Sequence, residues 1–452
     1  MSGPSLVWFR QDLRLEDQPA VAAATAGGSW IGVYVLDDDA PGGWALGSAQ
    51  RWWLHYSLKA LAEALEDRGG CLILRRGDSA AHIVDVARAV STDNVHALRH
   101  YEPWWQAAEQ AVADRLDLRL YDGRQLAAPG SVRTAAGGRY RVFTPFSRAL
   151  NQQMPPGAAL AAPRSISVPS VRPASEQLEK WGLLPHAPNW AGGFDVWRPG
   201  ETGAHEALEN FMDVLKDYAF ARDRPALEGT SRLSAHLHFG EISAAALWRR
   251  ASKRKGAEPW LRQLAWRDFC ANIIDIMPDY ANANGRPLYD KLAWRKGASA
   301  DRDFHAWTRG LTGYPIVDAG MRQLWATGFM HNRVRMIAAS FLIKHLLIDW
   351  RRGERWFWDT LIDADYGNNS VNWQWVAGTG IDSNPFGRIM APLVQSAKFD
   401  SANYIRRWVR ELAEVDDAKI HDPHATGAAT RGYPPPIIGH RAARERALAA
   451  QR

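Results

Sequence analysis

Short apolar runs and amphipathic stretches alternate through the first 130 residues of the chain. Five runs rich in β-branched and aromatic residues lie at 6–9, 30–36, 71–75, 95–101 and 118–122. Stretches with helical spacing of their apolar positions lie at 17–26, 48–66, 79–90 and 103–116. Strands that alternate with helices at this period are typical of a parallel sheet covered by helices. We therefore predict an α/β domain with a parallel, Rossmann-like sheet over residues 1–130.

The pattern changes twice after residue 130. Eight prolines between 155 and 199 interrupt a stretch with little periodicity, which is typical of a long connection. From about residue 203 the apolar positions recur at helical spacing, and one apolar stretch over 335–350 predicts a single helix. The sequence thus predicts an all-α C-terminal domain over 203–452, joined to the first domain by a Pro-rich linker over 131–202.

Composition narrows the class of protein. A chain of 452 residues, 46% hydrophobic and 23% charged, is globular and too long for one ordinary core. No apolar run reaches the length of a bilayer span, and the first residues do not form a secretory signal. We expect a soluble, cytoplasmic protein with no membrane partner. Cys71 and Cys270 are the two cysteines, which excludes a disulfide framework, a Cys-rich zinc site and a four-Cys iron–sulfur cluster and favours buried thiols.

Charge and tryptophan content add two weaker signals. The formal net charge of +6 favours an anionic partner such as nucleic acid. The 22 tryptophans fit either a large aromatic core or stacking on flat rings. Composition alone does not choose between these uses of tryptophan.

Residues 230–234 combine hydroxyls, an arginine and the start of a helix. Thr230, Ser231 and Ser234 surround Arg232 where an irregular stretch enters a helical one. Hydroxyls, backbone N–H groups at a helix start and an arginine can hold a phosphate. Thr and Ser also serve as ordinary helix N-caps, so the sequence leaves both interpretations open.

Arginines and acids flank the apolar stretch 335–350. Arg333 and Arg335 lie beside Asn332, and Asp363 and Asp365 follow the stretch. A buried arginine needs an acidic partner, so a structural salt bridge is one interpretation. The same groups can bind a metal, ribose hydroxyls or a polar ring, although no His or Cys typical of zinc accompanies Asp365. The next polar residues, Asn368 and Asn369, can also serve as turn residues.

A third cluster lies on the helix predicted over 259–277. Trp260, Gln263, Trp266 and Arg267 follow at i, i+3, i+6 and i+7, so most of them share one broad face. Tryptophan, an amide and arginine on one face suit a flat, hydrogen-bonding ligand. The alternative is that both indoles belong to the core and that the arginine pairs with an acid.

Longer motifs identify a family that the chain resembles. They are LVWFRQDLRLED (6–17), FTPF (143–146), EGTSRLS (228–234), TGYPIVDAGMRQL (312–324), MHNRVRM (330–336) and DADYGNNSVNWQWVAGTG (363–380). In this order the chain resembles the DNA photolyases and cryptochromes, most closely the bacterial cyclobutane-pyrimidine-dimer photolyases, from residue 6 to about 445. The resemblance implies an α/β antenna domain and a helical domain that binds FAD, whose reduced form is the active one.

The resemblance also implies which residues bind the cofactor. The flavin phosphates are expected at Tyr218, Thr230, Ser231, Arg232, Leu233 and Ser234. The ring and the adenosine are expected near Trp260, Gln263, Arg267, Asn332, Arg335, Asp363, Ala364, Asp365 and Asn369. Among these, Asn369 falls beside flavin N5, where an amide stabilises the reduced state.

Two further residue sets follow from the resemblance. An electron relay is implied from Trp294 through Trp350 to Trp373, because indole is oxidisable and short steps outrun charge recombination. Contacts to damaged DNA, with the pyrimidine dimer flipped out, are implied for Arg222, Gln263, Trp266, Asn332, Arg333, Met336, Trp375, Arg388 and Gln395. The implied enzyme is a monomeric deoxyribodipyrimidine photo-lyase that opens the dimer by electron transfer from excited reduced FAD.

Two positions depart from the family pattern. Gln263 stands where dimer-specific photolyases usually carry glutamate, which adds weight to the alternative of a cryptochrome-like photoreceptor with weak or no repair. Trp104 and Trp105 stand where folate-binding relatives carry an Asn–Glu pair. A folate antenna is therefore disfavoured, and the sequence leaves open a deazaflavin antenna, a flavin antenna or none.

Overall fold

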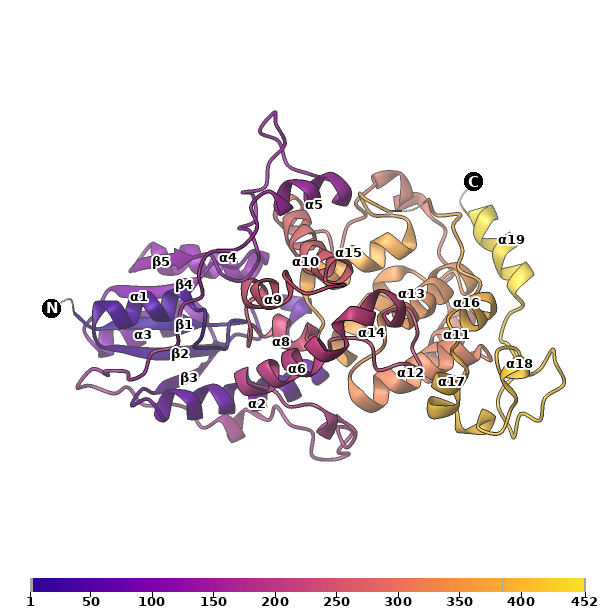
Figure 1. The fold of residues 1–452 in the computed structure, drawn as a ribbon, viewed down its shortest axis with the longest axis horizontal. Coiled ribbons are helices and arrows are strands. Elements are labelled where there is room, and N and C mark those ends of the chain that lie inside the picture. The colour runs from indigo at the N-terminus through magenta and orange to yellow at the C-terminus, as the bar shows by residue number, and fades with distance from the viewer. Residues whose placement is uncertain (1–2, 384, 451–452) are drawn as a thin grey trace.

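Two domains lie side by side along the long axis of the molecule in the computed structural model, which describes residues 3–383 and 385–450 (Figure 1). A parallel five-stranded sheet in the order β3-β2-β1-β4-β5 forms the N-terminal domain. Its elements are β1 (Ser5–Phe9), α1 (Pro19–Gly27), β2 (Trp30–Leu36), α2 (Ser48–Glu66), β3 (Leu72–Arg76), α3 (Ser79–Ala89), β4 (Asn94–Leu98), α4 (Pro103–Ala113) and β5 (Asp117–Tyr121). The predicted α/β class with a parallel sheet is confirmed.

Burial follows the position of each strand in the sheet. β1 lies at the centre between β2 and β4, and every residue of β1 and β2 is buried. Strands covered on both faces read as continuous apolar runs, which is why their limits were visible in the sequence. The edge strand β5 is only partly buried, and polar residues alternate along it. The helices supply the crossovers that parallel pairing requires.

The connection between the two domains is bound to both of them. Its helix α5 (Phe143–Asn151) buries Phe143 and Phe146 in the same apolar cluster as helix α10 of the helical domain. The residues after α5 run along the N-terminal domain, where Ile166 N–H donates to the Arg68 carbonyl at 2.7 Å. The connection is therefore not a free linker. The domain boundaries at residues 130 and 203 stay a prediction.

Helices make up the C-terminal domain, and no β-strand of the described residues follows β5. The longer helices are α6 (Glu201–Val214), α9 (Ala244–Ala251), α10 (Glu258–Ile276), α11 (Ala298–Thr308), α12 (Pro315–Thr327), α13 (Asn332–Ser340), α14 (Trp350–Thr360), α15 (Tyr366–Ala377) and α19 (His440–Ala450). The shorter ones are α7 (Tyr218–Ala221), α8 (Ser234–His238), α16 (Pro392–Lys398), α17 (Ala402–Trp408) and α18 (Asp417–Ile420). Single 3₁₀ turns are η1 (Gly42–Trp44), η2 (Leu178–Trp181), η3 (Phe194–Val196), η4 (Leu215–Asp217), η5 (Pro287–Lys291) and η7 (Arg410–Leu412).

The prediction of one helix over 335–350 is wrong. α13 passes into the π-helical turn η6 (Phe341–His345), and the chain then leaves helical geometry, with Leu347 in the left-handed region at φ 53°. Asp349 caps the next helix by accepting the Arg351 N–H at 3.1 Å, so α14 begins at Trp350. Because every residue from Ile337 to Ile348 is buried, Lys344 and His345 included, no exposed face marks where the helix breaks.

Buried hydrogen bonds join the two domains. The guanidinium of Arg14 in the N-terminal domain donates to the Gly240 carbonyl of the helical domain at 2.9 Å. In the other direction, Arg267 of α10 donates to the Arg124 carbonyl at 2.7 Å. All four groups are removed from water, so separating the domains would leave strong donors and acceptors to be resolvated.

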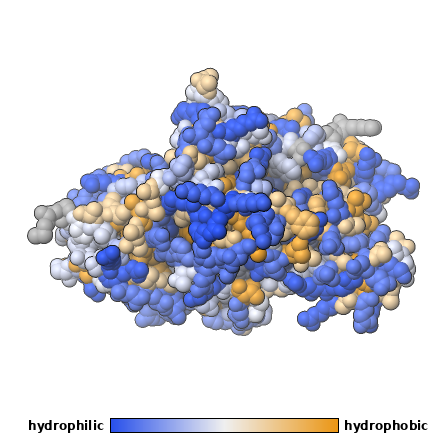
Figure 2. All heavy atoms as spheres, in the orientation of Figure 1, coloured by the Kyte–Doolittle hydropathy of each residue, from blue (hydrophilic) through white to orange (hydrophobic). Residues whose placement is uncertain are grey.

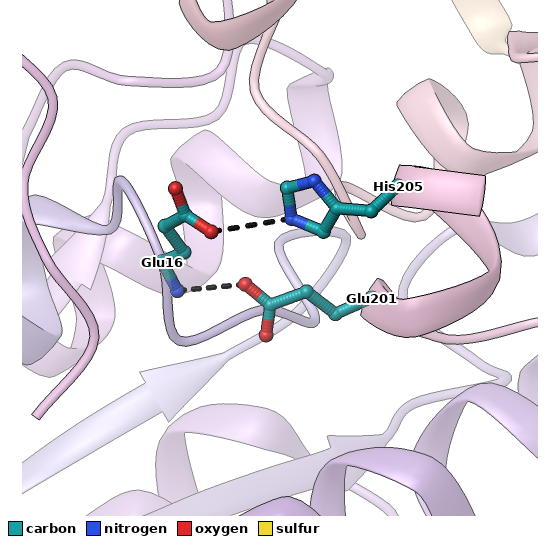
Figure 3. Close-up of side chains that lie close together, drawn as sticks. All are labelled: Glu16, Glu201 and His205. Atoms are coloured by element: carbon teal, nitrogen blue, oxygen red, sulfur yellow. Dashed lines mark hydrogen bonds and ion pairs between the residues drawn. The ribbon is translucent and has the colours of Figure 1, made fainter. Parts of the chain in front are cut away.

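Glu201 at the start of α6 forms a second joint (Figure 3). Its carboxylate accepts the backbone N–H groups of Leu15 at 3.0 Å and of Glu16 at 2.8 Å. One turn later, His205 lies 3.2 Å from the Glu16 carboxylate. The possible ligand atoms of Glu16, Glu201 and His205 lie within 4.8 Å of one another. Because backbone N–H groups already use both Glu201 oxygens, we interpret the cluster as a joint between domains and not as a metal site.

The exterior mixes hydrophilic and hydrophobic residues on the face drawn in Figure 2, with a hydrophilic zone over the middle of that face. Within the described ranges, the structure has no helix long and apolar enough to cross a bilayer. Both cysteines are free thiols. The prediction of buried thiols holds for Cys270, whereas Cys71 is half-buried.

Candidate flavin and DNA site

A cavity of about 440 Å³ lies between α10, α13, α14 and α15. Ten residues that the resemblance assigned to the cofactor, the lesion or the electron relay line it: Gln263, Trp266, Asn332, Arg335, Met336, Asp363, Ala364, Asn369, Trp373 and Trp375. Concave sites lined by aromatic rings with a few convergent polar groups are typical of small-molecule binding. The cavity therefore brings the second and third clusters of the sequence together at one place.

Helix α15 positions the amides of the cavity. Asp365 caps this helix by accepting the Asn368 N–H at 2.8 Å. Asn368 and Asn369 are therefore helical, and the interpretation of the two asparagines as turn residues is wrong. The Nδ2 of Asn369 donates to the Glu354 carbonyl of α14 at 3.2 Å. This bond fixes the orientation of the amide and leaves its oxygen available to the cavity.

Arg335 and Asp363 form a two-pronged ion pair at the cavity wall. Both terminal nitrogens of Arg335 lie 3.0 Å from the two carboxylate oxygens of Asp363. Arg335 Nε also donates to the Met330 carbonyl at 2.7 Å, which holds the guanidinium in place. The salt bridge considered from the sequence is thus present, and both of its residues line the cavity. Pairing with arginine leaves Asp363 poorly suited to a metal.

Asp365 lies deeper, among two arginines and a histidine that come from three segments. Arg124 is 3.8 Å and His238 is 3.9 Å from its carboxylate. Burial alone would raise the pKa of Asp365, but His238 and the charges of Arg124 and Arg267 lower it below the usual range, so the group stays ionised. Apart from these longer ion-pair contacts, Asp365 Oδ2, His238 Nδ1 and Arg124 Nε make no hydrogen bond within the protein. Buried polar atoms without a partner fit a bound polar cofactor at this depth.

Helix α10 divides the residues of the third cluster between two places. Gln263 and Trp266 line the cavity, and Trp266 packs edge-to-face on Phe143 of α5 with ring centroids 4.8 Å apart. Arg267 is buried behind them and donates to the Arg124 and Leu237 carbonyls, whereas the alternative interpretation paired it with an acid. Trp260 lies in the separate core of α6 and α9, where its ring is 5.0 Å from Phe211.

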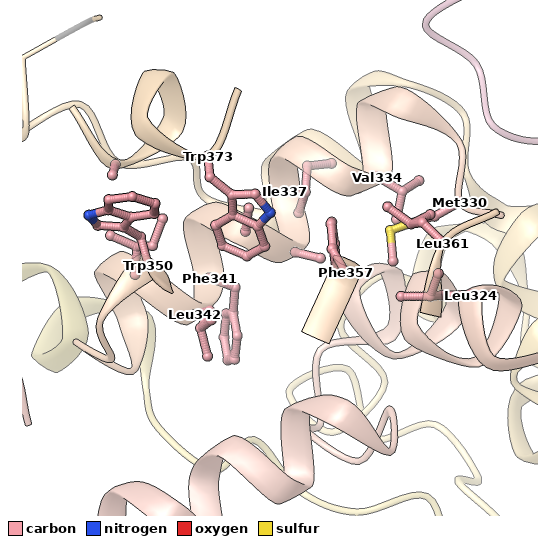
Figure 4. Close-up of a cluster of buried hydrophobic side chains, with 14 of the residues drawn as sticks. Leu324, Met330, Val334, Ile337, Phe341, Leu342, Trp350, Phe357, Leu361 and Trp373 are labelled. Carbon is pink, nitrogen blue, oxygen red and sulfur yellow. The ribbon is translucent and has the colours of Figure 1, made fainter. Parts of the chain in front are cut away.

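Three tryptophans lead away from the cavity. Trp373 lines the cavity and packs edge-to-face on Phe357 with centroids 4.9 Å apart. Trp350 is fully buried at the start of α14. Figure 4 shows the two indoles next to each other, with the nitrogen of Trp350 pointing away from Trp373. Trp294 is half-buried and lines another cavity near the surface.

The segment 230–234 lies outside the lining of the main cavity. Thr230, Ser231 and Arg232 line a separate hollow of about 360 Å³ beside α6. No side-chain cap bond forms at α8, so the N-cap interpretation does not apply to that helix. Arg232 has a left-handed backbone at φ 54° and pairs with Glu228. The phosphate role of this segment, including Tyr218, Leu233 and Ser234, stays a prediction.

Four of the predicted DNA contacts lie outside the cavity lining. Arg333 pairs with Asp223 at 2.6 Å, and Arg222 Nε lies 4.0 Å from the same carboxylate. Arg388 is exposed in the connection before α16, and Gln395 is half-buried on α16. Neither Arg388 nor Gln395 is part of the cavity lining.

Sequence reasoning missed several residues around the cavity. Arg262 and Phe143 line it and form a cation–π contact at 4.6 Å, and Asp382 accepts the Phe143 N–H at 2.8 Å. Arg262 lies four residues before Trp266 on α10, a spacing that could have drawn attention to it. Glu354 carried no signal, because only the packing of α14 on α15 brings its carbonyl to Asn369.

The two tryptophans at the expected antenna position pack inside the protein. Trp105 of α4 meets Trp8 edge-to-face with centroids 6.3 Å apart, and Trp104 meets Tyr366 of α15 at 5.0 Å. Packing thus gives both indoles a structural role. The identity or absence of an antenna stays open.

Two family models of known proteins match most of the chain. Residues 5–164 match the family model of DNA photolyase, and residues 260–452 match the FAD binding domain of DNA photolyase. The chain belongs to the DNA photolyase family. The helical domain is accordingly an FAD-binding domain, and the family resemblance deduced from the motifs is confirmed.

Individual relatives agree with this family. The deoxyribodipyrimidine photo-lyase of Agrobacterium fabrum is 46% identical, over 99% of this chain and 98% of the relative. A class III photolyase from Agrobacterium tumefaciens has a solved structure with a TM-score of 0.94, at 46% identity over 100% of this chain and 97% of that one. Cryptochrome-1 of Arabidopsis thaliana is 33% identical, over 97% of this chain and 68% of the relative. The protein is thus an enzyme of the photo-lyase type that shares its fold with a cryptochrome of known structure.

Proposed function

We propose that the protein repairs cyclobutane pyrimidine dimers in DNA by light-driven electron transfer. The observation that carries this proposal is one cavity in which two half-buried indoles meet a fixed ion pair and an oriented amide. The cofactor of this family, FAD, supplies the photochemistry and the electron when it is bound in its reduced form. The residues of the chain supply binding, orientation and a site shielded from water.

The inner wall of the cavity suits the flavin ring. The Arg335–Asp363 pair and the Asn369 amide are held by bonds to backbone carbonyls, so they are pre-organised before the ligand arrives. We assign Asn369 to flavin N5. We assign Asp365, with its unpartnered oxygen, to a hydrogen-bond donor of the cofactor.

The outer part of the cavity suits a dimer that has left the helix. Trp266 and Trp375 are half-buried and offer flat apolar surfaces for stacking. Arg222 and Arg333, near Asp223, and the exposed Arg262 lie in reach of an anionic backbone, which explains the expected affinity for damaged DNA. We assign Asn332 and Met336 of α13 to the rim of this part of the cavity.

The relay is proposed to run from Trp294 through Trp350 to Trp373. Its support is the buried Trp350 and Trp373 lying next to each other and the half-buried Trp294 nearer solvent. With FAD bound, Trp373 would be the residue that passes an electron toward the cofactor. Trp350 would then return an electron to Trp373, and Trp294 would return one to Trp350. The relay therefore serves to prepare the reduced enzyme and is not part of the repair step.

Gln263 decides between strong and weak repair. Its Nε2 donates to the Pro259 carbonyl on its own helix at 3.1 Å, which draws the amide back along α10. A glutamate cannot donate to a carbonyl, so Gln263→Glu would release the side chain toward the cavity. We expect this change to alter the repair yield more than the FAD content.

The test is repair by the purified, chemically reduced, FAD-bound protein. Under blue light, a thymine-dimer oligonucleotide should recover its thymine absorbance in proportion to the light absorbed. No recovery by protein that retains FAD would overturn the repair proposal. Gln263→Glu serves as the companion variant, and equal repair by both proteins would contradict the role given to Gln263. The proposed monomeric state is checked by light scattering of the same sample.

A cryptochrome-like photoreceptor is the second candidate. Two observations favour it: the Gln263 amide is held back on its own helix, and Cryptochrome-1 aligns over nearly the whole chain. Such a receptor would still be reduced through the relay in light. It would differ from a photolyase by leaving the dimer oligonucleotide unrepaired.

A further inference from the structure

Beside the proposed relay lies a second cavity, of about 420 Å³ and polar in character. Trp294 lines it together with Asn284, Asp290, Lys296, Asp349 and Arg351. It lies at the outer end of the relay, and one of its polar residues, Asn284, reaches the buried indole of Trp350.

A chain of hydrogen bonds connects Trp350 to a carboxylate at the surface. The indole Nε1 of Trp350 donates to Asn284 Oδ1 at 3.0 Å. Asn284 Nδ2 in turn donates to Asp290 Oδ1 at 2.7 Å. Trp350 and Asn284 are buried, and Asp290 is exposed. The negative charge of Asp290 polarises the Asn284 amide, and that amide in turn polarises the indole N–H of the buried Trp350.

The asparagine is fixed from both sides. Gln374 of α15, which follows Trp373, donates from Nε2 to the Ala283 carbonyl at 2.9 Å. Its Oε1 accepts the Gly285 N–H at 2.8 Å. The backbone before and after Asn284 is therefore attached to the helix that carries Trp373, so the Asn284 amide is pre-organised toward Trp350.

A positive charge also lies against the indole of Trp350. The guanidinium of Arg351 lies over the ring of Trp350, 4.6 Å from its centroid. A cation over an indole is attracted to the neutral ring and disfavours a positive charge on it. Asp349 pairs with this guanidinium at 3.2 Å, so Arg351 offsets its charge. The carboxylate that hydrogen bonds connect to the indole N–H is that of Asp290.

We propose that Asn284 and Asp290 tune Trp350 as the middle member of the relay. This inference rests on the relay stated under the proposed function. When oxidised Trp373 takes one electron from Trp350, the positive charge left on Trp350 makes its N–H more acidic. Asn284 holds that proton in a hydrogen bond without accepting it, and Asp290 compensates the charge until an electron from Trp294 refills Trp350. A thiol in solution then reduces Trp294. Asn284 and Asp290 are positioning residues, since neither touches cofactor or DNA.

The test compares Asp290→Asn with a matched control in FAD-bound protein. Asp279 accepts from Asn282 Nδ2 at 2.6 Å in a similar exposed Asn–Asp pair, but Asn282 makes no bond to an indole, so Asp279→Asn is the control. Transient absorption after a light flash should show the yield of oxidised Trp294 reduced about three- to tenfold in Asp290→Asn, because a compensating charge near the hole is lost. Asp279→Asn should match the unaltered protein, and Asp290→Glu should restore the yield.

A second measurement does not depend on photochemistry. With ¹⁵N-labelled tryptophan, the indole N–H signal of Trp350, assigned by its loss in Trp350→Phe, should move toward weaker hydrogen bonding in Asp290→Asn in the dark. An unchanged flash yield and an unchanged N–H signal in Asp290→Asn would overturn the inference. Photoreduction that survives in Trp350→Phe would instead overturn the relay, so the two failures are distinguishable.

Discussion

Gly353 provides a sharp test of how Trp373, the inner tryptophan of the proposed relay, is packed. This residue of α14 lies one turn after Trp350, and the ring of Trp373 rests against its backbone. A Cβ at this position would lie 2.7 Å from Trp373 Cζ3 and 2.5 Å from Leu342 Cδ2. Carbon atoms pack comfortably at about 3.5–4.0 Å, so Gly353→Ala must displace one or both side chains.

The size of the effect follows from two opposing contributions. Overpacking a core costs about 1–3 kcal/mol, and two buried neighbours place this site in the upper part of that range. Alanine in a helix interior regains about 1 kcal/mol relative to glycine. We therefore expect Gly353→Ala to lower the unfolding free energy by about 1–2 kcal/mol. Displacement of Trp373 should also slow photoreduction, because electron transfer weakens steeply with distance.

Urea unfolding measures the first effect, and the rate of flavin photoreduction per bound FAD measures the second. Gly367→Ala is the control, since a Cβ there would lie no closer than 3.3 Å to any neighbour. That control should lose no more than about 0.5 kcal/mol, because helix propensity offsets a slightly tight contact. A Gly353→Ala protein as stable as the parent, with an equal photoreduction rate, would refute the packing of Trp373 and Leu342 against Gly353.

Three further outcomes are expected. Asp363→Asn removes the charge partner of Arg335 at the cavity wall and should weaken FAD binding at least about tenfold, measured by flavin fluorescence titration; an unchanged Kd would contradict the placement of the flavin. Burial lowers the pKa of His331 to about 4 and of His345 to about 3, so both rings stay neutral in the folded protein while the unfolded chain protonates below about pH 6.5. Each ring should therefore lower the unfolding free energy as the pH drops from 6.5 toward 4, by about 2 kcal/mol at pH 5, whereas Asp268, whose pKa burial raises to about 7, acts in the opposite direction. His345→Gln should remove about 2 kcal/mol of the loss between pH 7 and pH 5 in urea titrations. An equal loss in parent and variant would contradict a neutral His345 ring. Glu201→Gln replaces one of two oxygens that accept backbone N–H groups and should cost about 1–2 kcal/mol, whereas unchanged thermal unfolding would show that the joint contributes nothing.

Much of the N-terminal domain could be predicted from pattern alone. Its strands are short apolar runs with polar borders, and helix α2 has the limits Ser48–Glu66 that its spacing indicated. The helical domain was harder, because its buried segments are apolar on every side. The break at 346–349 depends on the left-handed Leu347 and the cap by Asp349, which periodicity does not reveal.

The candidate site also has features that the sequence predicted and features that it did not. The pairing of Arg335 with an acid could be expected, since a buried arginine requires compensation. The surroundings of Asp365 could not, because Arg124 and His238 come from segments more than a hundred residues away. Helical spacing alone did not predict where Trp260 lies. It precedes Gln263 by one turn, yet it packs with residues of α6 in another core and not in the cavity.

The buried bonds at the domain joint have a consequence for how this protein can be cut and recombined. A fragment that ends near residue 130 would keep Arg14 but lose the Gly240 carbonyl, and would keep the Arg124 carbonyl but lose Arg267. It would also lose the Glu201 carboxylate that accepts the N–H groups of Leu15 and Glu16. The N-terminal domain is therefore not an exchangeable module. A chimera that transplants it should carry the start of α6 and the turn after α8 from the same parent.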